Sequence, residues 1–149
     1  MVMVVHATVR ATGVYADGTP ALEIHVRSSL ADGLPFERNR DIPVRLLLGG
    51  ERFRGRLKAT DDNDYVWLSP TLTALTGEGT TLGRELTRLG VRPNDRVRLA
   101  VRGRNIRVAD KWGYGLGTRA ARLNAVIGGV PKTLMQHLIR WVITSGQFT

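Results

Sequence analysis

The chain has 149 residues, of which 42% are hydrophobic and 23% are charged, as is ordinary for a folded globular protein and unlike a disordered one. Its 22 basic and 13 acidic residues give a net charge of +9, which favours a polyanionic partner such as DNA, RNA or an anionic membrane surface. The lack of Cys excludes a disulfide framework, a thiol nucleophile and a thiolate metal site, and it is compatible with a reducing, cytoplasmic setting.

The excess of positive charge comes almost entirely from Arg, which supplies 19 of the 22 basic residues. Arg suits bidentate contacts with phosphate and guanine. A coding sequence rich in G and C gives the same excess without any ligand, so both explanations stay open. No apolar run approaches the roughly 18 residues that span a bilayer, and we expect no membrane partner.

The first part of the chain predicts three strands. Residues 2–11 are rich in Val and Thr, residues 21–28 alternate between apolar and polar side chains, and residues 42–48 are mostly apolar. Residues 29–40 show no period and are predicted to form a loop. The Gly pair at 49–50 is a natural hairpin turn into the next strand.

Residues 52–58 are predicted to form a strand with one strongly basic face. Apolar side chains or Gly alternate with four cations, so the cations share one side of the strand. An Asp-rich turn at 61–64 and an aromatic strand at 65–68 follow, which completes a meander. The basic face either contacts an anion or is solvated and discourages edge pairing. Its cations are Arg52, Arg54, Arg56 and Lys58.

The chain changes character from residue 69, where we expect an irregular segment. Residues 80–90 carry Leu at helical spacing and end in Gly, which predicts one short amphipathic helix. Residues 96–108 then predict a second basic-faced hairpin, in which Arg96 and Arg98 point away from the core.

The last part of the chain is predicted to be an extension of a barrel domain that covers residues 1–110. Residues 111–149 begin with a linker of Gly and aromatic residues and end in a helix over about 131–144 with a broad apolar face. That face either packs on the barrel or binds a partner, including a second copy of the chain. The candidate partner-binding residues are Trp112, Leu134, Leu138 and Trp141.

No catalytic motif stands out, so an enzymatic function is unsupported and no cofactor is predicted. The three His residues have no spacing that requires a metal site. The acidic cluster at 61–64 lacks the Gly and the distal Glu of a calcium-binding loop, and a turn explains it more simply.

The order of elements resembles a known superfamily. Basic-faced hairpins are followed by a short helix ending in Leu89-Gly90-Val91 and by the sequence Pro-Asn-Asp-Arg-Val-Arg-Leu at 93–99. This pattern, over residues 41–109, is similar to the helix, turn and strand unit of DNA-binding pseudobarrels, which include the plant B-three type and the effector domain of EcoRII-like restriction enzymes. The superfamily usually has Gly-Asp before the strand, whereas this chain has Asn-Asp.

The predicted elements indicate a mainly β protein, a small antiparallel, pseudobarrel-like barrel with one short inserted helix and a helical C-terminal extension. The resemblance implies a barrel that lays strands and loops into the major groove of DNA. We therefore expect binding of double-stranded DNA, as the recognition module of a defence or regulatory system. An RNA-binding protein that stacks bases on its aromatic residues and a protein-assembly module are the alternatives. The candidate nucleic-acid contacts are Arg38, Arg40, Arg52, Arg54, Arg56, Lys58, Arg96 and Arg98.

Overall fold

The computed structural model describes residues 1–117 of the chain, which form nine strands, one α-helix and one 3-10 helix. In chain order the elements are β1 (Met3–Val14), β2 (Pro20–Arg27), η1 (Ser28–Leu30), β3 (Ile42–Leu48), β4 (Glu51–Ala59), β5 (Tyr65–Leu68), β6 (Thr71–Ala74), β7 (Gly79–Thr81), α1 (Leu82–Arg88), β8 (Arg96–Arg102) and β9 (Asn105–Asp110).

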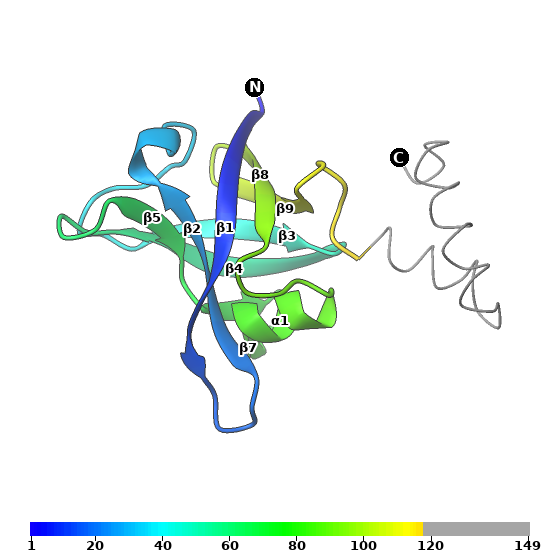
Figure 1. Cartoon of the computed structure of the whole chain (residues 1–149). Helices are drawn as coiled ribbons and strands as arrows, with labels where there is room; N and C mark the ends of the chain where they lie inside the picture. Colours follow the sequence, from blue (N-terminus) through cyan, green and yellow to red (C-terminus); the bar gives the residue numbers. More distant parts are fainter. Residues whose placement is uncertain (118–149) are drawn as a thin grey trace.

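Seven of the strands close into a barrel (Figure 1). Their order is β3-β9-β8-β1-β2-β5-β4, and pairing of β4 with β3 completes the ring. A ring with an odd number of strands cannot alternate in direction throughout, so at least one neighbouring pair must be parallel. That pair is β3 and β9, while the other six pairings are antiparallel. The parallel pair therefore joins β3, the third strand in chain order, to β9, the last strand of the barrel.

The alternating pattern of β4 explains which side of the barrel wall is polar. Phe53 and Leu57 point into the core, with 3% and 1% of their surfaces exposed, and Gly55 lies between them. Arg52 and Arg54 point out to solvent. Since every second residue of a strand faces the same side, the basic face predicted from the sequence is the outer face of the barrel.

Helix α1 covers the barrel beside β2 (Figure 1). The hydroxyl oxygen of Thr81 caps its first turn by accepting a hydrogen bond from the backbone N–H of Arg84 at 3.1 Å. Leu82 and Leu86 are fully buried. The Leu residues are therefore spaced at the helical period because they form the apolar side of α1 that packs onto the sheet.

The predicted fold class is confirmed, since the protein is mainly β, with a small barrel and one short α-helix in its described part. The expectation of an irregular segment after residue 69 is wrong, because β6 and β7 form a hairpin there and β6 pairs with β4. Strands of four and three residues are too short to show a period. The predicted helix at 131–144 lies outside the described residues.

Candidate nucleic-acid interface

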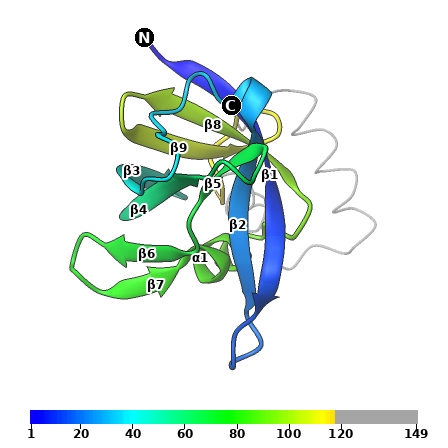
Figure 2. The same ribbon diagram turned by 90° about the vertical axis from the view of Figure 1, so that its left-hand side faces the viewer.

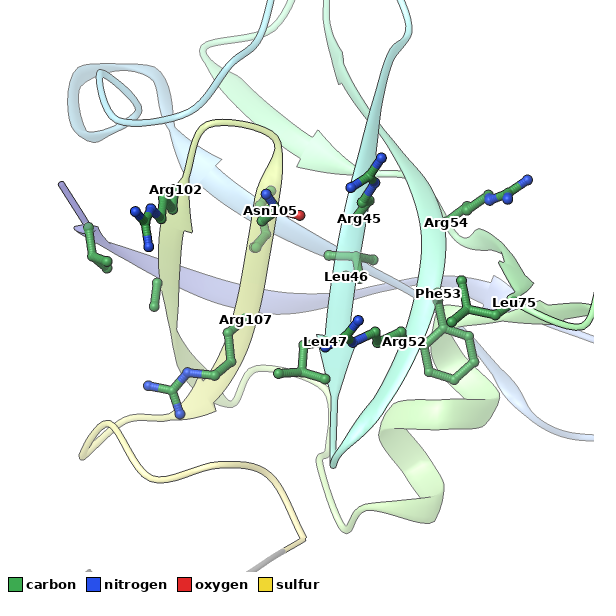
Figure 3. Close-up of a pocket in the computed structure, with 13 residues that line it drawn as sticks. Arg45, Leu46, Leu47, Arg52, Phe53, Arg54, Leu75, Arg102, Asn105 and Arg107 are labelled. Carbon is green, nitrogen blue, oxygen red and sulfur yellow. The ribbon is translucent and has the colours of Figure 1, made fainter.

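A groove of about 800 Å³ crosses the outer face of the barrel, over β3, β4, β8 and β9 (Figure 3). The β8–β9 hairpin and the β6–β7 hairpin lie on either side of β3 and β4 (Figure 2). We call this feature the arginine groove after the cations that line it, which are Arg45, Arg52, Arg54, Arg102 and Arg107. Its other exposed or half-buried lining residues are Val2, Leu47, Leu75, Ala100 and Asn105.

The strand register brings these cations together from distant parts of the chain. Arg45 on β3 lies directly opposite Arg54 on β4. On its other side Arg45 is in register with Asn105 of β9, which in turn lies opposite Arg102 of β8. Neighbouring strands are about 5 Å apart. One row of side chains across four strands therefore holds three guanidinium groups and one amide.

A second row mixes charge with apolar surface. Leu47 of β3 lies between Arg52 of β4 and Arg107 of β9, and Arg107 lies opposite Ala100 of β8. The groove thus offers cations around a partly apolar floor (Figure 3).

Among residues 1–117, no carboxylate lines the arginine groove. Its five guanidinium groups form no ion pair with any residue in the range 1–117. A side pocket of about 430 Å³ adjoins the groove and shares Arg45, Arg54 and Asn105 with it, and it adds Arg104 without adding an acid. This surface is consequently a region of uncompensated positive charge, which attracts anions.

The predicted basic face of β4 divides into two parts in the structure. Arg52 and Arg54 line the groove. Arg56 and Lys58 lie further along the strand, and each has a side-chain nitrogen 3.6 Å from a carboxylate oxygen of Asp41. That carboxylate compensates part of their charge, which sets them apart from the cations of the groove.

The two predicted contacts in the loop before β3, Arg38 and Arg40, both interact with other groups of the protein. Arg38 donates a hydrogen bond from Nη1 to the backbone carbonyl of Thr60 at 3.0 Å. Arg40 forms an exposed ion pair with Glu37 at 3.3 Å. Neither residue lines the groove, so the structure separates this loop from the arginine cluster.

The two predicted arginines of β8 also lie outside the groove. Arg96 is exposed beside Trp112 in a small hollow that contains Asp95 and Asp110. Arg98 is half-buried, and its Nε is buried with no hydrogen-bond partner among residues 1–117.

Of the predicted partner-binding residues, the structure describes Trp112. Its surface is 59% exposed, and the Lys111 ammonium lies 4.5 Å from the ring centroid. Leu134, Leu138 and Trp141 lie outside the described residues.

Four arginines of this surface are not among the contacts predicted from the sequence. Arg45 is the one cation in an otherwise apolar strand, and Arg102, Arg104 and Arg107 surround the β8–β9 turn. Their outward positions could be read from alternation. Arg45 meets β4 through the hairpin that the Gly pair at 49–50 predicts. The approach of Arg102, Arg104 and Arg107 to β4 could not be predicted, because it depends on the parallel β3–β9 pairing.

Aromatic side chains gather elsewhere on the barrel. The rings of His25 and Tyr65 are stacked with centroids 4.2 Å apart, and Trp67 lies 5.5 Å from Tyr65. His25 also pairs with Glu23 at 2.9 Å. In the described range no cluster of three or more His, Asp or Glu side chains could hold a metal ion, and none of its helices is long and apolar enough to cross a membrane.

The fold and the groove define this protein as a closed β-barrel with a basic outer groove. No protein-family model matches the chain, and no solved structure matches it. It is similar over 35 residues to the glutamine-dependent NAD(+) synthetases of Mycobacterium bovis and Mycobacterium leprae, with 60% identity to each. The match covers 24% of this chain and spans only 5% of the synthetases. A similarity this short shows no family.

Proposed function

We propose that this protein binds double-stranded DNA through the arginine groove and acts as a recognition module without chemistry of its own. The observation that carries the proposal is the set of five arginines from four strands that share one groove, to which the described residues contribute no carboxylate. Guanidinium groups donate to phosphate oxygens in a fixed fork geometry, which suits a duplex backbone. Action on DNA in the cytoplasm, within a defence or regulatory system, is part of this proposal.

The arrangement of the groove favours a duplex over a single strand. Proteins that bind single strands usually stack the bases on exposed aromatic rings. Phe53 is the aromatic residue in the groove lining, and its side chain is buried at 3% exposure. Tyr65 is stacked on His25 outside the groove. The cations are instead spread over four neighbouring strands, as contacts with phosphates on a broad surface require.

This mode of binding makes the affinity depend on salt. Each phosphate that the protein neutralises releases counterions, so log K falls with log salt concentration with a slope of about −0.9 per phosphate contact. Five arginines in the groove correspond to a slope of roughly −4 to −5 if each holds one phosphate.

The test compares two double variants that remove the same charge. We expect Arg45→Gln with Arg54→Gln to weaken duplex binding at least about tenfold and to reduce the salt slope by roughly two. The control is Arg27→Gln with Arg92→Gln, because these two cations are exposed and lie outside the groove. Fluorescence anisotropy of a labelled duplex across a salt series measures both quantities. If both double variants lost the same affinity for the duplex, the binding would depend on net charge alone and not on the arginine groove.

A protein-assembly function is the second candidate, and the exposed ring of Trp112 favours it. Size-exclusion chromatography with light scattering would then give a stable oligomer that Trp112→Ala dissociates, together with no affinity for duplex DNA. Tighter binding of single-stranded RNA than of duplex DNA would instead support the RNA-binding alternative.

A further inference from the structure

Asn105 differs in chemistry from the other described residues that line the arginine groove. Within residues 1–117, it is the one side chain of the lining that both donates and accepts hydrogen bonds. It lines both the groove and the side pocket, and it is exposed. In the described part of the chain, no group forms a hydrogen bond with its amide.

The backbone of Asn105 is fixed by strand pairing with β8 on one side and β3 on the other. It is the first residue of β9 and lies opposite Arg102 of β8 across a two-residue turn. Gly103 opens that turn with a φ of 60°, as the first central residue of a type II′ hairpin turn does. The N–H of Arg45 donates to the carbonyl of Arg104 at 2.9 Å, and β3 pairs with β9 from Asn105 onward. A side chain on such a paired strand is positioned more precisely than one on a free loop.

The neighbours of Asn105 indicate what its amide would contact. Phosphate oxygens only accept hydrogen bonds, and the flanking Arg45 and Arg102 supply donors for them. An amide with a donor and an acceptor matches a ligand that offers both. In the major groove, adenine presents an acceptor at N7 and a donor at N6, which an Asn side chain binds in a bidentate manner.

We infer that Asn105 reads an adenine base in the major groove of the bound duplex, while the arginines on either side hold the phosphates that fix its position. The inference rests on the proposed function and extends it from binding to sequence preference. It assigns the start of β9 as the element that reads sequence, and the arginines of β3, β4 and β8 as the groups that hold the backbone.

The experiment selects bound sequences from a randomised duplex pool with the full-length protein and three variants. We expect the wild-type protein to enrich a motif that contains an adenine. Asn105→Ala should lose the preference at that position, with a roughly 5- to 150-fold loss on the preferred site and little change on other duplexes. Asn105→Gln should retain an adenine preference, because it keeps the amide. Arg45→Gln should weaken binding to all sequences alike and leave the motif unchanged.

The outcomes separate this inference from the proposed function. Duplex binding by the wild type without an enriched motif, or a motif that Asn105→Ala leaves intact, overturns the role of Asn105 and leaves DNA binding standing. An absence of duplex binding by the wild type overturns both. Because Asn105 is exposed, its replacement should leave the thermal unfolding midpoint nearly unchanged, and this measurement identifies any variant that fails to fold.

Discussion

Arg45 and Arg54 face each other across two paired strands, and no acid of residues 1–117 forms an ion pair with either. Like charges directly opposite each other destabilise a sheet, so this pair works against folding. The same juxtaposition provides two guanidinium groups at the spacing of neighbouring strands, which suits donation to an anion. Under the proposed function, this pair therefore lowers the stability of the sheet and raises the affinity for DNA.

Removing one member of the pair should relieve the repulsion. We expect Arg54→Gln to raise the free energy of unfolding by a few tenths of a kcal/mol at low salt, and the gain should shrink as salt screens the charges. Urea denaturation at low and high salt measures it. The matched control is Arg27→Gln, whose cross-strand neighbour is Tyr65 rather than a cation. A stability gain of the same size in both variants would contradict the repulsion.

The close approach between α1 and β2 explains why α1 has Gly at position 83. Gly83 is buried in α1, and a Cβ at this position would collide with the backbone carbonyl oxygen of Pro20. That oxygen belongs to β2 and cannot move as the end of a side chain can. The helix can therefore pack directly against the β1–β2 hairpin because residue 83 has no side chain.

Gly83→Ala should consequently destabilise the protein, although Ala is the better helix former by about 1 kcal/mol. We expect a net loss of at least about 1 kcal/mol in the free energy of unfolding, because overpacking against backbone costs more than helix propensity returns. Gly79→Ala is the control, since a Cβ there meets nothing within 4 Å, and it should change stability by less than about 0.5 kcal/mol. Denaturant unfolding of the two variants decides the matter, and equal effects would refute the close-packing explanation.

At the scale of the described molecule, residues 1–117, the main feature is the closed ring of strands. All seven strands of the barrel lie within residues 3–110, and the ring is completed by pairing of β3 with both β4 and β9. The core that fills it is one continuous cluster. A ring of this kind has no unpaired edge along its closure, which suits independent folding.

We therefore expect residues 1–117, produced alone, to unfold in a single cooperative transition with a midpoint within about 5 °C of the full-length protein. Circular dichroism during heating measures this. Under the proposed function, the same fragment should bind duplex DNA, since it contains all five arginines of the groove. A fragment that melts without cooperativity would show that the predicted boundary near residue 110 is wrong.

Most of the individual elements could be predicted from the sequence, because their side chains repeat with the period of the structure that they form. The alternation in β4 and β8 identifies both the strands and their outward arginines, and the Leu spacing identifies α1. The β6–β7 hairpin was missed because seven residues in two short strands carry too little pattern.

What the sequence alone determined is therefore the fold class, the strand faces and the positive charge. The hairpin turn at 49–50 also determined that Arg45 lies opposite Arg54, because a two-residue turn fixes the register of its strands. Only the tertiary structure decided that the arginines of β8 and β9 join them. Arg45 and Arg107 are 62 positions apart in the chain, yet they line the same groove, while Arg56 lies beside Asp41 instead. Local periodicity fixes the direction in which a side chain points and a turn fixes its hairpin partner, whereas pairing between distant strands is encoded by no local pattern.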